Sequence, residues 1–343
     1  MEYSPEQPSE ASADPRGPAS TPADPVAPYQ VGFPRHPDRC VESPTNGAGT
    51  VPEGLGGADS AVKFARAYRA CGFAPIPVPL GMKAPSLLGW PRLQIADDEV
   101  DRRFRAPTNV GLLTGNASGG LVDVDLDCDE AVSLAEYFLP PTPMRSGRPS
   151  RPSSHAWYTL TGPAPDITRF HDLDGTCLLE IRGNGGQTLV SPSMHPEGEP
   201  YEWEGPFEPA AVHGDELERS AKQLAAAALL VRHWPKEAGS RHDIANAFSG
   251  ALLRANWSEA EVCDFIGRIA RAAGDEEVDD RIRAAEETAR TLERGEEATG
   301  KPTLARLIGD EVVRRCAFRT IVITGIGIMI TRIGHHDHPD RWL

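Results

Sequence analysis

Residues 119–125 end in two aspartates separated by one valine, and this run constrains the fold more than any other feature of the chain. Apolar residues precede the pair, as is typical of a buried β-strand. Alternate side chains on a strand share one face, so Asp123 and Asp125 should project together, about 7 Å apart along the backbone. Such a pair can share divalent cations, although the same spacing also occurs at the solvated end of an ordinary strand.

Further polar groups stand at the ends of two other apolar runs. Ser153, Ser154 and His155 open one run, and Glu180 closes another just before the glycine-rich segment 183–186. A third carboxylate would complete a metal site, and a histidine beside serines can hold a triphosphate. These residue types therefore point to chemistry on phosphates.

Four segments of the chain carry a likeness to a known family. They are residues 72–79 with 83–85 and 89–90, residues 109–115 leading to the aspartate pair, residues 153–155, and residues 180–186 followed by 191–195. In order and spacing, from about residue 58 to 210, they resemble the bifunctional primase-polymerase domain of phages, plasmids and integrated elements. That domain is related to archaeal and eukaryotic primase catalytic subunits. The resemblance implies an α/β catalytic domain built on a mixed α+β sheet.

The resemblance also implies a catalytic metal site. Asp123, Asp125 and Glu180 would be the catalytic residues and would hold two magnesium or manganese ions, with glutamate standing where many primases have aspartate. Two such ions can clamp the attacking and leaving oxygens of a phosphoryl transfer. The implied activity is that of a nucleotidyltransferase, a DNA-directed primase and polymerase. It would synthesise or extend primers on a single-stranded DNA template during replication of a mobile element or phage.

Nucleotide-binding residues follow from the same likeness. His155, with Ser153 or Ser154, would contact the phosphates of incoming nucleoside triphosphates, and Lys83 would line the nucleotide site. For Lys83 the alternative is a solvated loop lysine. Arg182 lies two residues after the third acid and shares its strand face, which makes it a further candidate for phosphate. A salt bridge to the neighbouring acids is the alternative for Arg182.

Composition limits the other possibilities. Fifty acidic against 35 basic residues give a net charge of −15, so any DNA contact must be local rather than a general electrostatic coat. Six cysteines form no CxxC pair and no secretory signal is present, which is typical of a reduced cytoplasmic protein and predicts no structural zinc. The apolar run 320–330 is too short to cross a bilayer as a helix, so no membrane association is expected.

The chain is expected to have four parts. Residues 1–57 are rich in proline, serine, alanine and glycine and predict a disordered tail before the catalytic domain at 58–211. Residues 212–318 carry apolar stripes at helical spacing, including one headed by a capping box at 258–261, and predict a small all-helical accessory domain. Residues 319–343 predict an irregular C-terminal tail.

Local patterns predict individual elements. Helices are expected at 60–70, 97–104, 128–138 and 278–292, and strands at 109–114 and 120–125. The segment 183–186 lies between two extended runs and predicts a hairpin turn. The resemblance puts His195, just after the second run, near the active site, whereas an exposed loop histidine is the alternative.

One motif resembles an ATPase loop without being one. Residues 295–301 copy the first seven positions of a Walker A loop, but Pro302 replaces the hydroxyl residue that would bind magnesium, and the segment follows a predicted helix. Any helicase partner would therefore be separately encoded.

Two other functions remain open. The chain could be a replication module that binds DNA or a helicase while its catalytic site has decayed. The acidic charge and the unusual approach to His155, residues 148–154, favour this alternative. It could instead be a metal-dependent nucleotide hydrolase that uses the same carboxylates on water. Template-dependent incorporation of nucleotides separates the polymerase from both.

Overall fold

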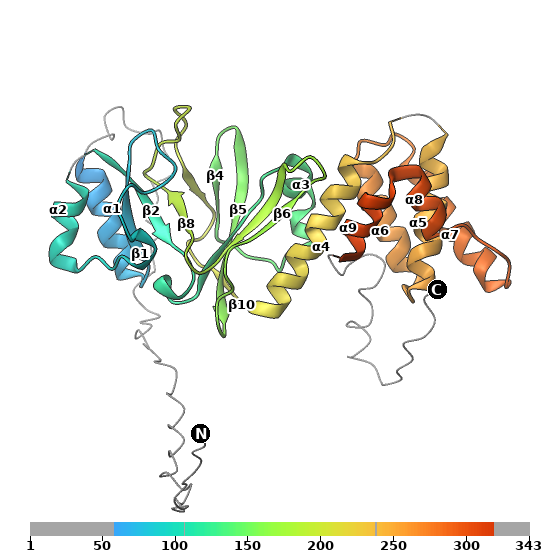
Figure 1. Ribbon diagram of the computed structural model, residues 1–343, viewed down its shortest axis with the longest axis horizontal. Helices are drawn as coiled ribbons and strands as arrows, with labels where there is room; N and C mark the ends of the chain where they lie inside the picture. The colour runs from blue at the N-terminus through green and yellow to red at the C-terminus, as the bar shows by residue number, and fades with distance from the viewer. Residues whose placement is uncertain (1–57, 106, 237–238, 319–343) are drawn as a thin grey trace, which may run out of the picture. The chain divides into compact units, whose positions relative to one another are not determined.

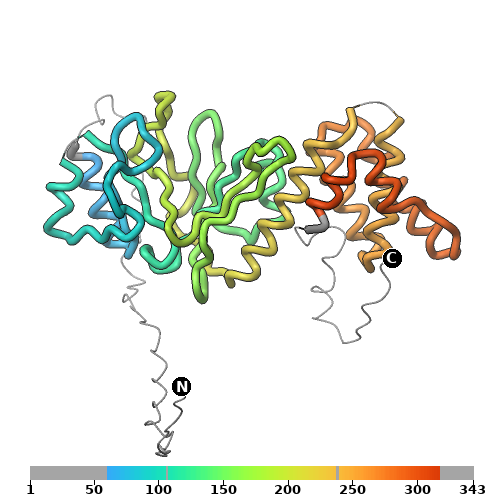
Figure 2. The backbone as a smooth tube through the Cα atoms, in the orientation of Figure 1, coloured from blue at the N-terminus to red at the C-terminus, as the bar shows by residue number. Residues whose placement is uncertain are grey.

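The computed structural model describes residues 58–105, 107–236 and 239–318, which form a mixed α+β fold (Figures 1 and 2). Its two sheets are antiparallel apart from one parallel strand pair. The mixed α+β class predicted from the sequence is therefore confirmed. The tails predicted at 1–57 and 319–343 lie outside the described residues.

Short helices precede and follow the first strand. Helix α1 spans Ala58–Ala70, as predicted, and Gly72 then turns the chain with a φ of 83°. A 3₁₀ turn, η1, spans Trp90–Arg92. The helix predicted at 97–104 is a 3₁₀ turn, η2 (Asp97–Glu99), that continues into α2 (Val100–Phe104).

The smaller sheet has the order β1-β2-β8, with strands Ala74–Pro79, Thr108–Leu113 and Gln187–Val190. Strand β1 carries proline at every second position. In an antiparallel strand, the backbone N–H groups of every second residue point toward the same neighbouring strand. The prolines of β1 occupy the positions whose backbone nitrogen points away from β2, so the pairing with β2 loses no hydrogen-bond donor. The proline pattern is therefore compatible only with an edge strand.

The larger sheet has the order β6-β7-β3-β5-β4-β9, and β10 pairs with β5 in parallel. Its central strand β3 is the predicted strand that ends in the aspartate pair. The 3₁₀ turn η3 (Asn116–Ser118) precedes β3, and helix α3 (Asp129–Phe138) follows it. The strand bounds are β3 Leu121–Asp125, β4 Arg145–Arg148, β5 Arg151–Thr161, β6 Thr168–His171, β7 Cys177–Arg182, β9 Glu202–Glu204 and β10 Ala210–His213.

The hairpin predicted around residues 183–186 is wrong. Strand β7 pairs within the larger sheet and β8 within the smaller one, so this segment carries the chain from one sheet to the other. The Thr114 hydroxyl donates to the Gly183 carbonyl at 2.6 Å, and the Thr114 N–H donates to the Gly186 carbonyl at 3.0 Å. A Cβ on Gly183 would lie 1.9 Å from the Pro165 carbonyl oxygen. Two extended runs on either side of a glycine-rich segment do not reveal which strands they pair with.

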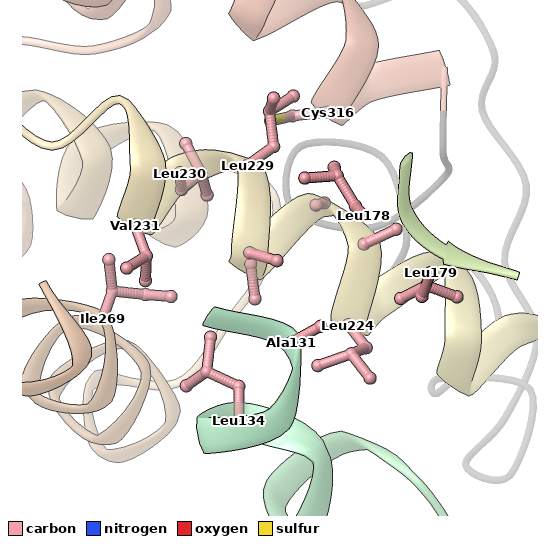
Figure 3. Packing of buried hydrophobic residues seen from close by; sticks show 14 of the residues in the cluster. Ala131, Leu134, Leu178, Leu179, Leu224, Leu229, Leu230, Val231, Ile269 and Cys316 are labelled. Carbon is pink, nitrogen blue, oxygen red and sulfur yellow. The ribbon is translucent and has the colours of Figure 1, made fainter. Parts of the chain in front are cut away.

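One face of the larger sheet is apolar and covered by helices. Val122 and Val124 of β3 belong to the same buried cluster as residues of α3 and of α4 (Gly214–Arg232). Figure 3 shows Leu224 of α4 close to Ala131 of α3 and to Leu179 of β7. Because strand side chains alternate, the aspartates of β3 project from the opposite face.

Helices fill the described residues after β10. The predicted apolar stripes on α5 and α6 are buried, and the predicted capping box is confirmed: the Ser258 hydroxyl accepts from the Glu261 N–H at 3.3 Å. Residues 295–301, which copy part of a Walker A loop, follow a helix, as expected. No helix among the described residues is long and apolar enough to span a membrane. The remaining bounds are α5 Ser240–Arg254, α6 Glu259–Ala272, α7 Val278–Glu293, α8 Lys301–Ile308 and α9 Asp310–Phe318.

Candidate active site

Strand pairing brings four of the residues singled out in the sequence together. Asp125 of β3 faces Glu180 of β7 on one side and His155 of β5 on the other. Facing residues of antiparallel strands project to the same side, and Asp123 shares that side because it lies two residues before Asp125. The His155 Nδ1 atom lies 3.0 Å from Asp123 Oδ2 and 3.4 Å from Asp125 Oδ1. We call Asp123, Asp125 and Glu180 the carboxylate cluster.

The carboxylate cluster is buried. Asp123 is 0% exposed, Glu180 6% and Asp125 7%, so these charges need cations nearby. His155 supplies one. Burial by itself would lower the pKa of His155, but the neighbouring Asp123 and Asp125 outweigh burial and raise this pKa above its ordinary value. The protonated imidazole is therefore favoured between the two aspartates.

Arg182 supplies a second cation and joins all three acids. Its Nε donates to Glu180 Oε2 at 2.9 Å, and its Nη2 donates to Asp125 Oδ2. Its Nη1 lies 3.7 Å from Asp123 Oδ2. Burial would lower the pKa of Arg182, but the three carboxylates together raise it, so the guanidinium stays charged. The salt-bridge alternative for Arg182 is thus the arrangement in this structure.

The sequence did not reveal two other contacts of the cluster. Arg169 of β6 faces Glu180 across the sheet, and its Nη2 lies 2.6 Å from Glu180 Oε1. The Thr188 hydroxyl, on β8 of the smaller sheet, donates to Asp123 Oδ2 at 2.7 Å. Neither residue carries a local signal, because each contact depends on which strands become neighbours.

The two serines have different surroundings from the cluster. Ser153 has a φ of 52°, and both its N–H, at 2.7 Å, and its hydroxyl donate to the Glu204 carboxylate of β9. Ser154 is buried, and its carbonyl accepts the Leu126 N–H at 2.8 Å. The structure therefore ties Ser153 to a carboxylate that would compete with any phosphate.

Lys83 is exposed in the loop after β1. Its carbonyl accepts from the Gln187 side chain at 2.7 Å, and this bond holds the loop against the start of β8. Because Lys83 is exposed, its amine is accessible to a ligand.

His195 is buried, so the alternative of an exposed loop histidine is wrong. It is 6% exposed, its Nδ1 accepts from the Glu197 N–H at 3.2 Å, and its Nε2 has no hydrogen-bond partner. Burial, and then the charges of Lys83 and Arg148, lower the pKa of His195, which favours the neutral imidazole. Its ring lies 6.0 Å from that of Tyr201, measured between centroids.

The donor set of the cluster suits a hard divalent cation. Magnesium and manganese prefer carboxylate oxygens, and Asp123 Oδ1 is a fully buried acceptor with no hydrogen-bond partner. An unpaired buried carboxylate oxygen is costly, and a bound cation would satisfy it. Within the described ranges, however, no three His, Cys, Asp or Glu side chains converge as a metal cage. The residues therefore fit a site built on the two aspartates.

Comparison with known proteins identifies the domain that contains this cluster. Residues 65–215 match a family model described as the N-terminal domain of bifunctional DNA primase/polymerase. The matched segment contains every site residue expected from the sequence. Searches against curated proteins and against solved structures found no match.

Proposed function

Because residues 65–215 belong to the bifunctional DNA primase/polymerase family, we propose that the protein is a metal-dependent nucleotidyltransferase. It adds nucleotides to a primer or strand end, directed by a single-stranded DNA template, in the replication of a phage or another mobile element. The observation that carries this proposal is the convergence of Asp123, Asp125 and His155 on one sheet face inside that domain.

The aspartates are the proposed metal ligands. Asp123 offers a free buried oxygen, and Asp125 lies on the same face of the same strand. Magnesium or manganese bound there would activate the 3′-hydroxyl and offset the charge that develops on the α-phosphate. His155 holds both aspartates in place through its Nδ1, which fixes the carboxylates before substrate binds.

The nucleotide is proposed to bind beside this cluster. Lys83 offers an exposed ammonium to the triphosphate, and His155 and Arg182 supply positive charge next to the carboxylates. Ser153 and Ser154 remain proposed phosphate contacts, although for Ser153 this requires release from Glu204. The departing pyrophosphate would be stabilised by the same cations.

Other parts of the proposal concern the rest of the chain. Helices α4–α9 are proposed to form the accessory domain predicted at 212–318. A helicase partner, encoded separately, would unwind the template. Cytoplasmic location remains a prediction from the spacing of the cysteines.

Incorporation of labelled nucleotides on a single-stranded DNA template, with magnesium or manganese, tests the proposal. We expect wild type to extend or synthesise a strand, and Asp123→Asn to lose at least about 100-fold in rate, since metal activation is removed. Arg169→Gln is the matched control: it also removes a charged contact of the cluster, but its side chain is 55% exposed and we expect a change below about 10-fold. No incorporation by folded wild type with either metal would contradict the proposal.

A decayed binding module is the second candidate, and one observation favours it. Arg182 forms ion pairs with Asp125 and Glu180, which occupies oxygens that a catalytic metal would need. This candidate predicts binding to single-stranded DNA without incorporation. Release of phosphate or pyrophosphate from free nucleotides, without strand growth, would instead indicate a hydrolase.

A further inference from the structure

We propose that His195, Arg148 and Lys83 form an anion site that takes the terminal phosphate of a nucleoside triphosphate. The site is built on the turn 195–199, which lies between β8 and β9, and not on the strands that carry the carboxylate cluster. The identity of the anion rests on the proposed function. His195 and Arg148 are thereby added to the phosphate-binding residues.

The turn 195–199 holds the imidazole of His195 in place. The His195 Nδ1 atom accepts from the Glu197 N–H at 3.2 Å, and the His195 N–H donates to the Glu199 carbonyl at 2.7 Å. The imidazole also meets the ring of Tyr201 edge-on. A backbone N–H can only donate, so Nδ1 is the acceptor nitrogen, and the neutral imidazole carries its proton on Nε2.

The Nε2–H group of His195 is a buried donor that lacks an acceptor. Among the described residues, no atom forms a hydrogen bond with it. Nearly all buried polar groups in folded proteins are paired, because an unpaired donor costs stability. An oxygen of a bound anion would satisfy this donor. The anion reaches Nε2 when neighbouring side chains shift, and the exposed side chains of Lys83 and Glu197 can do so.

Arg148, at the end of β4, brings a permanent positive charge next to this imidazole. Its Nη1 lies 3.3 Å from Glu197 Oε2, and His195 Nδ1 lies 3.3 Å from the same oxygen, so the two side chains are neighbours. The same Nη1 donates to Glu199 Oε2 at 3.0 Å. Both acids therefore use one nitrogen of Arg148. Since a guanidinium carries five N–H donors, Arg148 can bind a further anion.

Lys83 brings a second positive charge. The Gln187 side chain donates to the Lys83 carbonyl at 2.7 Å, which fixes this part of the loop beside β8. Burial first, and then the charges of Lys83 and Arg148, lower the pKa of His195, so both cations act on the same imidazole. Two cations around a neutral N–H donor are a set suited to a phosphate that carries two negative charges.

Tyr201 connects the anion site with the carboxylate cluster. Burial raises the pKa of Tyr201, and the charges of Arg148, Asp125 and Arg182 act on the same phenol. The α-phosphate of the nucleotide is proposed to react at the cluster, so a neighbouring anion site is suited to the other end of the triphosphate. The burial of His195 also favours a terminal phosphate, which can enter a recess, over a phosphodiester inside a DNA strand.

Glu197 is expected to compete with the anion. Its carboxylate pairs with Arg148 and lies beside His195, but its side chain is 75% exposed. Ion pairs of such exposed groups are weak, so a phosphate can replace this carboxylate. Removal of the Glu197 charge should therefore strengthen anion binding, an effect that a purely structural role of the turn does not predict.

Isothermal titration calorimetry of the full chain with inorganic tripolyphosphate, in buffer without divalent metal, tests the anion site. We expect wild type to bind, and Arg148→Gln and Lys83→Gln each to bind at least about 5-fold more weakly. Glu197→Gln should bind about 2- to 5-fold more tightly. Arg102→Gln is the matched control, because it removes a charge from an arginine that pairs with Glu99 instead, and its affinity should stay within about 2-fold.

Two substitutions of His195 separate binding from structure. Asparagine can still accept from the Glu197 N–H but offers no donor at the position of Nε2, so His195→Asn should weaken binding at least about 5-fold. Glutamine reaches further and can place an amide N–H near that position, so His195→Gln should stay within about 3-fold of wild type.

No tripolyphosphate binding by folded wild type would overturn the inference, and so would weaker binding by Glu197→Gln. If Arg148→Gln does not fold, the exposed Lys83 and Glu197 still decide the point. An oligothymidylate without terminal phosphates is the second probe. If His195→Asn lost affinity for this strand but not for tripolyphosphate, the site would bind template DNA and the assignment to the nucleotide would be wrong.

The binding and incorporation assays can fail separately. Wild type that extends a template but shows none of these effects on tripolyphosphate binding would refute the anion site and keep the proposed function. The expected binding pattern without any incorporation would do the reverse.

Discussion

At the residue scale, the site is a set of buried acids held together by cations from other strands. His155 lies between Asp123 and Asp125, and Arg182 joins both aspartates to Glu180. Buried charges of one sign are stable only when they are paired. The protonation of His155 should therefore affect the stability of the whole fold.

The pH dependence of stability tests this point. Burial alone would lower the pKa of His155, but the two aspartates raise it above its unfolded value of about 6.5. A raised pKa in the folded state contributes stability that is complete below the unfolded pKa and is lost as pH rises through the folded pKa. In metal-free buffer, the free energy of unfolding of wild type should fall relative to that of His155→Gln as pH rises above about 6.5 and through the raised folded-state pKa.

Urea unfolding of both proteins across that range is the measurement. The contributions of all other titrating groups cancel when the two proteins are compared. Only the difference between their curves of unfolding free energy against pH is therefore interpreted. Parallel curves would show that the position of His155 between the aspartates does not raise its pKa.

At the element scale, the crossing between β7 and β8 joins the two sheets next to the site. Thr188, which bonds to Asp123, lies on β8 directly after this crossing, so the path of residues 183–186 determines where Thr188 meets the larger sheet. Gly183 is required there because the Pro165 carbonyl occupies the space of a side chain. The segment is therefore a tightly packed connection and not a free turn.

Substitution of Gly183 by alanine should be destabilising. The added Cβ would lie 1.9 Å from the Pro165 carbonyl oxygen, so the backbone must move, and we expect a loss of about 1–3 kcal/mol in the free energy of unfolding. Gly214→Ala is the matched control, because its Cβ would meet its nearest atom at an ordinary 3.6 Å and we expect a change within about 0.5 kcal/mol. Equal urea midpoints for the two variants would contradict this account.

At the scale of the whole molecule, α4 links the sheet to the helices that follow it. Its Leu224 and Leu229 belong to one buried cluster that includes Leu178 of β7 and Ile269 of α6 (Figure 3). Arg232 at the end of α4 lies 3.2 Å from Glu130 of α3, measured from Nη2 to Oε2. A core shared in this way couples the larger sheet to the helical region.

Leu229→Ala tests the coupling. Leu229 is 0% exposed, so its truncation should cost about 2–5 kcal/mol, and both tryptophan fluorescence and far-ultraviolet circular dichroism should report the same lowered urea midpoint. Leu88→Ala, at a fully exposed leucine, should change stability by less than about 0.5 kcal/mol. Separate midpoints for the two signals would instead mean that the helices unfold as an independent domain.

The local elements were predictable because their signals are local. The spacing of Asp123 and Asp125 on an apolar run predicted both a strand and a shared face, since strand side chains alternate. The capping box at Ser258 and the apolar stripes on α5 and α6 predicted helices in the same way. Segments in family order also singled out Asp123, Asp125, His155 and Glu180, which the strand pairing brings onto neighbouring strands.

By itself, then, the sequence determined the strand and helix types, the positions of the acids and histidine, and the family of the domain. Only the tertiary structure decided that β7 and β8 lie in different sheets, that Thr188 and Arg169 contact the cluster, and that Arg182 is directed at carboxylates. The physical reason is that periodicity and capping act within a few residues. Strand partners, in contrast, are determined by packing across the whole chain. The charged groups that contact each acid depend on those partners.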